Sequence, residues 1–266
     1  MKSTFNIGII IKAFCGLIAL GIFSSCEEVI NLKLNTSESQ IVIQGSVYDH
    51  PGPYTVKITR TVGFDESNIY PPVTGAEVVI SDNAGNSDVL TETTPGTYMT
   101  STLQGTVGRT YSLTISADGK NFTAVSTMQL AVNIDSLYCE KSFFGDYLQL
   151  YAEFSDSAGV ENYYNLIQSI NGVIRDGAGF TNDQLDDGKT IKFLFMPYDE
   201  ESLLYAGDTT TVWLETIDKG VYDYYRTLFQ YASQYTTPAN PVSNINNRAL
   251  GYFKACSIRE KTIICE

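Results

Sequence analysis

The cysteine with the clearest chemical role is Cys26. Two lysines, Lys2 and Lys12, precede an apolar run of 11 residues, Ala13–Phe23, and two serines separate that run from Cys26. A secretory signal shows this order of positive charge, short apolar run and small residues before the cleavage site. Eleven apolar residues are too few for a spanning helix, which needs ~20. We therefore expect residues 1–25 to be a lipoprotein signal peptide that is cleaved before Cys26.

Lipidation would make Cys26 the membrane anchor of the mature chain. With its thiol and its new amino terminus both acylated, Cys26 would carry the two lipid signals that stable anchoring requires. The alternative is a plain secretory signal followed by an incidental cysteine, but the stretch contains no Ala-x-Ala-type cleavage site. We expect contact with the membrane through this lipid.

Three cysteines remain once Cys15 leaves with the signal peptide and Cys26 carries lipid. An odd number in an exported protein predicts one disulfide and one free thiol, or no disulfide. Cys256 and Cys265 would suit a bridge if they lay on neighbouring strands of a terminal hairpin, with Cα atoms within about 7 Å. We take this pair as the candidate disulfide. Cys139 is the third cysteine, and no two of the cysteines have zinc-finger spacing.

Residues for catalysis are scarce. The single histidine, His50, lies in a turn of proline and glycine, whereas a serine or cysteine nucleophile needs a base that a third group orients. Paired acids can hydrolyse glycosides, but the clusters Asp186–Asp187 and Asp199–Glu201 both adjoin glycine or proline, which favours solvated loops. We expect no catalytic residue, no cofactor and no enzyme activity.

A calcium site is the best metal candidate in the sequence. Residues 82–88 offer several carboxylate and amide oxygens, which calcium prefers, although their spacing is not that of an EF-hand. Asn and Gly at these positions are also what a hairpin turn needs. We therefore interpret the segment as a turn and expect no metal.

Aromatic residues gather in the second half, where 13 of the 18 tyrosines follow residue 131. Tyrosine supplies large amphipathic contact area at interfaces. Tyr147 and Tyr151 share one face of an alternating segment with Gln149 and Glu153. We take Tyr147 and Tyr151 as the candidate ligand-binding residues, with ordinary strand propensity as the alternative explanation.

The balance of charge restricts the partners. Without Lys2 and Lys12, 15 basic side chains stand against 30 acidic ones, a formal charge of −15. A net acidic protein repels phosphate backbones and anionic headgroups. We expect no binding to nucleic acid, and partners that are neutral, cationic or proteins.

The elements that must position these residues are mostly strands. After a polar lead over residues 26–38, β-branched and aromatic runs alternate with turn signals, which predicts an immunoglobulin-like β-sandwich over residues 39–130. Residues 131–266 repeat the pattern and predict a second β-rich domain. Apolar and aromatic residues recur every three or four positions over residues 219–233, which predicts one amphipathic helix packed on that domain. The expected fold class is all-β, with two sandwich-like domains.

Two resemblances add to this prediction. The first domain resembles the immunoglobulin-like or transthyretin-like modules of bacterial surface proteins, in the stretches Pro71–Asp82, Pro95–Tyr98 and Gly108–Leu113. The whole mature chain resembles an uncharacterised family of Bacteroidota lipoproteins, domain of unknown function 4249. The residues that carry this second resemblance are Cys26–Ile30, Gly52–Val56, Gly75–Ala76, Glu161–Tyr164, Val221–Leu228, Asn240–Ile245 and Leu250–Phe253.

The family resemblance implies a location and a partner rather than a reaction. Members look like companions of TonB-dependent outer-membrane receptors, and Glu27–Glu28 after Cys26 resembles the acidic signal that exports such lipoproteins to the cell surface. We therefore expect an outer-membrane lipoprotein, at the cell surface, that acts as a non-catalytic accessory or ligand-binding subunit of such a receptor. The alternatives are a surface adhesin or spacer and a glycan-active enzyme.

Overall fold

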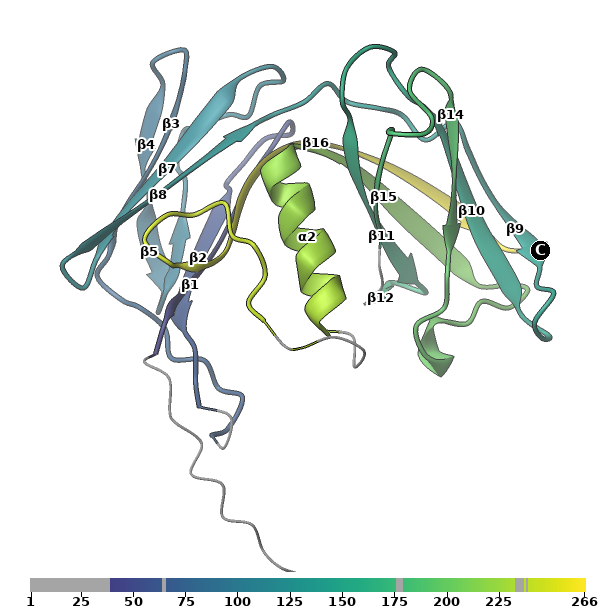
Figure 1. The fold of residues 1–266 in the computed structure, drawn as a ribbon, viewed down its shortest axis with the longest axis horizontal. Coiled ribbons are helices and arrows are strands. Elements are labelled where there is room, and N and C mark those ends of the chain that lie inside the picture. The colour runs from purple at the N-terminus through teal and green to yellow at the C-terminus, as the bar shows by residue number, and fades with distance from the viewer. Residues whose placement is uncertain (1–38, 64–65, 176–178, 233–236, 238) are drawn as a thin grey trace, which may run out of the picture. The chain divides into compact units, whose positions relative to one another are not determined.

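The computed structural model describes residues 39–63, 66–175, 179–232, 237 and 239–266 (Figure 1). The expected signal peptide, the lead over residues 26–38 and the lipidated Cys26 lie outside these residues.

Strands are the main secondary structure of the described chain, as predicted. In the first half they are β1 (Ile41–Tyr48), β2 (Thr55–Arg60), β3 (Glu77–Asp82), β4 (Ser87–Val89), β5 (Thr91–Thr94), β6 (Thr97–Met99), β7 (Thr110–Ala117) and β8 (Lys120–Thr127). In the second half they are β9 (Ser136–Lys141), β10 (Leu148–Ser155), β11 (Tyr163–Ile170), β12 (Val173–Arg175), β13 (Phe180–Asn182), β14 (Thr190–Phe195), β15 (Thr209–Ile217) and β16 (Leu250–Ile264). The helical elements are the short 3-10 helix η1 (Glu200–Ser202) and the α-helix α2 (Lys219–Ala232).

One long sheet runs through the whole structure in the order β12-β11-β15-β16-β1-β2-β6-β5, with β13 paired to β11. Strand β16 connects the two halves. Its first residues, Leu250–Cys256, pair in parallel with β1, and its later residues, Ser257–Ile264, pair antiparallel with β15. Figure 1 shows this yellow strand passing from the first half into the second.

A smaller sheet covers each end of the long sheet. In the first half the sheet β4-β3-β7-β8 packs on β1, β2 and β6, and the core between them includes Ile43, Ile58, Ile80, Leu113 and Ile115. The period-2 alternation of Tyr111, Leu113 and Ile115 with polar residues predicts one inward face for this strand, and all three side chains are buried in β7. This packing of two sheets is the predicted sandwich.

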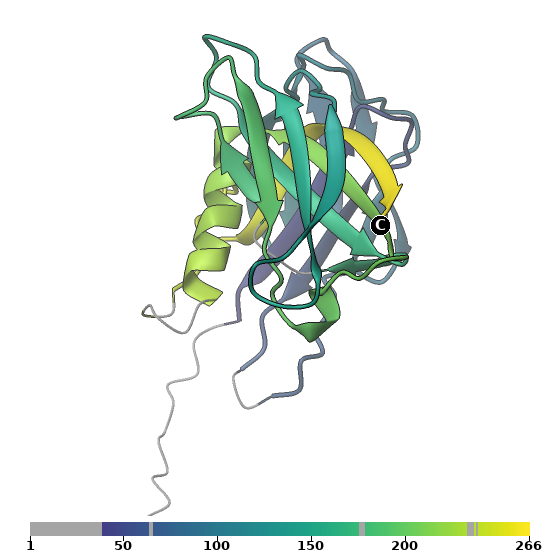
Figure 2. The same ribbon diagram turned by 90° about the vertical axis from the view of Figure 1, so that its right-hand side faces the viewer.

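In the second half the sheet β14-β10-β9 packs on β11 and β15. Figure 2 shows these three strands in front of the long sheet. Leu150 and Phe154 of β10, Tyr164 of β11 and Leu214 of β15 meet in this core. Phe154 and Tyr164 make an edge contact, with ring centroids 4.8 Å apart.

The expected boundary at residues 130 and 131 does not separate two independently packed cores. Ile245, Ala249, Phe253 and Ala255 come from the second half but are buried in the core of the first sandwich, and residues 38–266 form one compact unit. The physical reason is that β16 serves both sandwiches. At its start Gly251 has φ +92, and a Cβ there would lie 1.9 Å from the carbonyl oxygen of Ile43, so only glycine lets β16 approach β1 so closely.

Helix α2 forms over the predicted residues, and Asp218 caps it. The carboxylate of Asp218 accepts the amide of Val221 at 3.0 Å, as an N-cap does, and also the hydroxyl of Ser126 at 2.5 Å. On α2 itself, the side chains of Val221 and Tyr224 are buried. The predicted apolar stripe is only partly buried, because Leu228 is 42% exposed and Phe229 beside it is 44% exposed.

One buried carboxylate closes the loop after β6. Asp88 of β4 accepts the backbone amides of Ser101, Thr102 and Leu103 at 2.7–2.9 Å. Burial raises the pKa of Asp88, but these hydrogen bonds to the ionised form outweigh burial and hold the pKa below its ordinary value.

Asp88→Asn is therefore expected to lower the free energy of unfolding by about 2 kcal/mol at pH 7, since the amide accepts these hydrogen bonds without the charge. The depressed pKa means that the stabilisation is present above the unfolded pKa and is lost as pH falls through the folded pKa. Urea unfolding should thus show the variant and wild type converging below about pH 3.8. Asp146→Asn on the exposed β9–β10 turn is the control. An equal loss at pH 7 and in acid would contradict this account.

Candidate functional site

Helix α2 lies along the end of the long sheet formed by β11 and β13 (Figure 1). Two hollows open on the line of contact between them. We call this line, with the residues that line both hollows, the α2 seam. Phe180 of β13 lies between the hollows. Its ring contacts Tyr222 and Phe229 of α2 edge-on, each at a centroid distance of 5.9 Å.

The first hollow, beside the C-terminal half of α2, is apolar and has a volume of about 470 Å³. Its walls include Leu166, Ile174, Phe180, Tyr198, Leu228 and Phe229. Ile174 is 64% exposed and Tyr198 is 67% exposed, so large apolar surface faces the solvent here. Small-molecule sites have this size and an apolar lining with a few placed polar groups.

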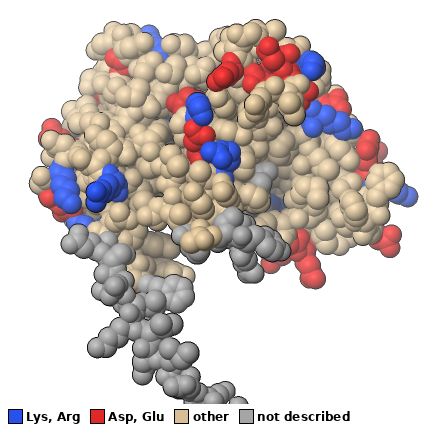
Figure 3. Space-filling view, viewed as in Figure 1, with Lys and Arg blue, Asp and Glu red and all other residues tan. Residues whose placement is uncertain are grey.

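The second hollow, beside the N-terminal half of α2, is polar and has a volume of about 460 Å³. Its charges are paired, since Lys219 and Arg226 both contact Asp223, at 2.9 and 3.4 Å. Figure 3 shows basic and acidic side chains side by side over α2. Tyr163 donates to Glu161 at 2.9 Å, and burial together with this carboxylate raises the pKa of Tyr163 to about 12. The described lining of the hollow therefore presents two basic and three acidic side chains together with tyrosine hydroxyl groups.

A buried ion pair lies beneath the apolar hollow. Lys254 of β16 and Glu215 of β15 are 3% and 0% exposed, and their Nζ and Oε1 atoms are 2.5 Å apart. Asn165 donates to the other oxygen of Glu215 at 2.8 Å, and Lys254 donates to the hydroxyl of Tyr225 at 3.4 Å. Asn165 and Tyr225 also line the hollow, so its floor is the upper layer of this buried network.

Aromatic rings surround the lysine. The Nζ atom lies 5.4 Å from the ring centre of Tyr48 and 5.9 Å from those of Tyr225 and Tyr252, within cation–π range. Burial alone would lower the pKa of Lys254, but the carboxylate of Glu215 raises it well above the ordinary value. Burial also disfavours the charged form of the neighbouring Cys256 thiol, and for a thiol this raises the pKa. The lysine is therefore held charged and the thiol neutral.

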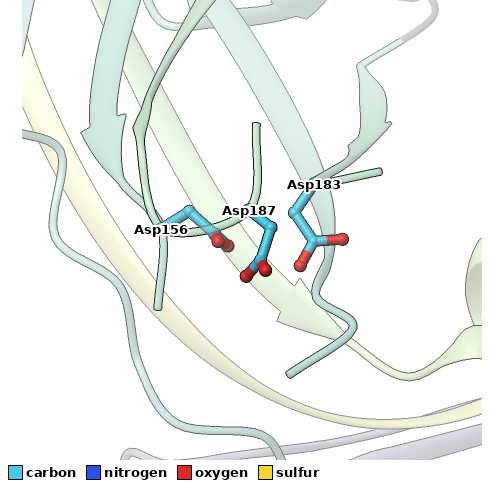
Figure 4. A group of neighbouring side chains, drawn as sticks. All are labelled: Asp156, Asp183 and Asp187. Atoms are coloured by element: carbon cyan, nitrogen blue, oxygen red, sulfur yellow. The ribbon is translucent and has the colours of Figure 1, made fainter. Parts of the chain in front are cut away.

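A cluster of three carboxylates lies in the loops beyond β10 and β13. Figure 4 shows Asp156, Asp183 and Asp187 turned toward one another, and one carboxylate oxygen from each lies within 4.8 Å of the others. Calcium takes such oxygens. The same groups already hold the loops, since Asp156 accepts from Tyr164 at 2.5 Å and Asp187 from the amide of Gly159 at 2.6 Å.

The candidate ligand residues Tyr147 and Tyr151 do not form one surface. Tyr151 stacks on Tyr138 with ring centroids 5.5 Å apart, and the ammonium of Lys192 lies 4.3 Å above its ring. Tyr147 precedes β10, and Gln149 between the two tyrosines is only 3% exposed. The expected solvent-facing row is therefore interrupted. Neither tyrosine lines the α2 seam.

The candidate disulfide was paired wrongly. Cys265 bonds to Cys139, with Cα atoms 5.6 Å apart, and Cys256 is a buried free thiol. The expected hairpin does not exist, because Leu250–Ile264 is one continuous strand. Nine residues along a strand separate Cα atoms by roughly 30 Å, so Cys256 and Cys265 cannot reach each other.

The weaker chemical candidates have local explanations. His50 is exposed and stacks on Tyr48 with centroids 5.1 Å apart. In the turn over residues 82–88, both oxygens of Asp82 accept from protein groups, including the amide of Asn86 at 2.9 Å and Arg109 at 2.8 Å. Burial raises the pKa of Asp82, but these hydrogen bonds hold it below its ordinary value. A turn explains this segment, as expected.

Neither the α2 seam nor the buried ion pair of Lys254 and Glu215 was predicted from the sequence. Lys254 and Glu215 each stand inside an apolar strand, which is a usable signal, because a charge that is buried in a sheet needs an opposite partner. Arg175, Phe180 and Tyr198 carry no comparable local signal, since only the fold brings them to one hollow.

The fold and the seam together define a β-sandwich protein whose long sheet carries one helix with a ligand-sized groove beside it. The chain belongs to the family described as Domain of unknown function (DUF4249), whose model matches residues 27–262. Among solved structures, a two fibronectin type-III domain segment from chicken tenascin is similar, at 8% identity and a TM-score of 0.25, over 85% of this chain and 99% of that one. No curated protein matches the chain.

Within the part of the chain that the structure describes, no helix has both the length and the apolar character needed to cross a membrane.

Proposed function

We propose that the protein is a non-catalytic lipoprotein of the outer membrane, anchored through Cys26 at the cell surface, which binds a ligand in the α2 seam as an accessory to a TonB-dependent receptor. The observation that carries the binding role is the apolar hollow, which has ligand-sized volume, exposed aromatic walls and a polar floor. The signal-like start and the resemblance to receptor-associated lipoproteins support the location and the partner.

The seam favours binding over the two alternatives. A passive spacer or adhesin scaffold would have no need for a concave aromatic surface, which this chain has beside α2. A glycan hydrolase needs two carboxyl groups that face each other across a cleft. In the polar hollow Asp223 is paired with two cations, Glu161 accepts the hydroxyl of Tyr163, and Asp183 accepts the amide of Asn162.

Co-purification tests the receptor role. The tagged protein, taken from gently solubilised native membranes, is expected to bring a TonB-dependent receptor with it in near-equal amount, as measured by mass spectrometry. Cys26→Ala should lose both membrane attachment and the receptor.

A seam variant separates anchoring from binding. Phe229→Glu places a charge on a side chain that is already 44% exposed, so the fold should persist while receptor or ligand recovery falls at least about fivefold, the effect of ~1 kcal/mol. Val89→Glu, on an exposed position of β4 away from the seam, is the matched control. Recovery of the protein alone, with or without its anchor, would end the accessory proposal.

A further inference from the structure

Arg175 stands out among the residues that line the apolar hollow. Of the described residues in that lining, it is the one with a charged side chain. It belongs to β12, opposite Gln168 of β11, and its side chain is 20% exposed. A single cation in an otherwise apolar wall gives the hollow a positive end.

The guanidinium of Arg175 is not fully used. Its Nε atom is buried and has no hydrogen-bond partner among the described residues. A buried donor without an acceptor is unfavourable, so native structures pair nearly all such groups. The described part of the chain therefore leaves some of the hydrogen-bonding capacity of this guanidinium unused.

The one ion pair that Arg175 makes is easily exchanged. Its NH1 atom contacts an oxygen of Glu201 at 3.1 Å, and the side chain of Glu201 is 80% exposed. Exposed pairs of this kind contribute little stability. The side chain of Arg175 is 20% exposed, so a carboxylate that entered the hollow could displace Glu201 and accept charge-assisted hydrogen bonds from the NH groups of the guanidinium.

Two polar side chains of the hollow are already engaged. Asn165 donates to Glu215, and the hydroxyl of Tyr225 accepts from Lys254. Apart from the neutral hydroxyl of Tyr198, the rest of the lining, including Phe180 and Phe229, is mostly apolar or aromatic. Among the described lining residues, a charged head would thus meet a cation only at Arg175, and an apolar tail would meet the apolar walls.

We infer that the apolar hollow binds a small amphipathic carboxylate, with its apolar chain between α2 and β11–β13 and its carboxylate on the guanidinium of Arg175. This inference rests on the proposed binding role of the seam and adds the chemical class of the ligand. The hollow's volume of about 470 Å³ lies within the 300–1,000 Å³ usual for small ligands.

Calorimetric titration of the full chain carrying Cys26→Ala tests the inference with two matched probes, decanoate and decanol. Decanoate should bind, and decanol, which has the same chain length without the carboxylate, should bind at least about tenfold more weakly, the effect of losing one charge-assisted contact. Arg175→Gln should weaken decanoate by a similar factor and leave decanol unchanged. Phe144→Glu, on a 78% exposed position outside the seam, should leave both affinities unchanged.

Equal loss of both probes in Arg175→Gln would overturn the inference, because the arginine would then only shape the hollow. If decanoate and decanol bound the unaltered hollow with equal affinity, the inference that a carboxylate is recognised would be overturned, and the hollow would be an apolar binding site only. Binding of neither probe would also overturn it. The co-purification with Phe229→Glu decides the proposed accessory role separately from these results.

Discussion

Lys254→Met is expected to lower the free energy of unfolding by about 3–5 kcal/mol, because it leaves the carboxylate of Glu215 buried without its cation. Glu215 is 0% exposed and lies under α2, so water cannot replace the ammonium without opening the helix from the sheet. The remaining contact to Glu215, the amide of Asn165, carries no charge. Urea unfolding of the two proteins at pH 7 measures the difference.

The double variant Lys254→Met, Glu215→Met separates two quantities: the net contribution of the ion pair to the free energy of unfolding, and the loss of stability when only one partner is removed. Replacing both partners of a buried pair with apolar residues of similar size is often neutral or stabilising. The double variant should therefore recover most of the loss. A double variant as unstable as the single one would show that the strands here require the charges, and a single variant within about 1 kcal/mol of wild type would contradict burial of the pair.

The pH dependence of this pair has a definite sign. The pKa of Lys254 is raised in the folded protein, because Glu215 stabilises the ammonium more than burial opposes it. Stability from this lysine is thus fully present below the unfolded pKa, about 10.5, and is lost as pH rises through the higher folded value. Between pH 7 and 10 the contribution of Lys254 should stay constant.

Short sequence patterns predicted the positions of single strands and helices and the side of each that is buried. Alternation in Tyr111–Ile115 located β7 and its inward face, and three- and four-residue spacing located α2. Each of these features depends on which side of one element is apolar. Such information is present in a short window of sequence.

The pairing partners of the strands could not be predicted from such short windows of sequence. The two apolar runs in Leu250–Cys265 read as a hairpin, whereas the chain continues straight and finds β1 and β15 as neighbours. The register of a strand depends on residues far away in the sequence, since Leu250 of β16 pairs with Val42 of β1, 208 positions earlier. The wrong disulfide and the sharing of β16 between the two sandwiches both follow from this one strand.

The seam shows the same limit for function. Tyr147 and Tyr151 were chosen because they share a strand face with polar residues, but Gln149 on that face is buried and Tyr151 stacks on Tyr138. The residues that do form a hollow come from β11, β12, β13, the segment before η1, and α2. The sequence predicted a helix at α2 that packs on the domain, whereas Leu228 on that helix is 42% exposed and forms part of the open wall.

Removal of the disulfide with Cys139→Ser and Cys265→Ser is expected to lower the free energy of unfolding by about 2–5 kcal/mol. The bond connects residues that are 126 positions apart, so it restricts a large loop of the unfolded chain. It also ties β9 to the end of β16, where the second sandwich closes. Loss of the bond should therefore act on the end of β16 that pairs with β15 before it reaches the start that pairs with β1.

Urea unfolding with and without a thiol reductant provides the matched control. Wild type in reductant should approach the stability of the double serine variant, and the variant itself should not respond to reductant, since Cys256 is a buried free thiol. A response of the variant to reductant would reveal another bond. Equal stability of oxidised wild type and variant would mean that the unfolded chain is already as compact as the bond would make it, which would remove the entropic basis of the prediction.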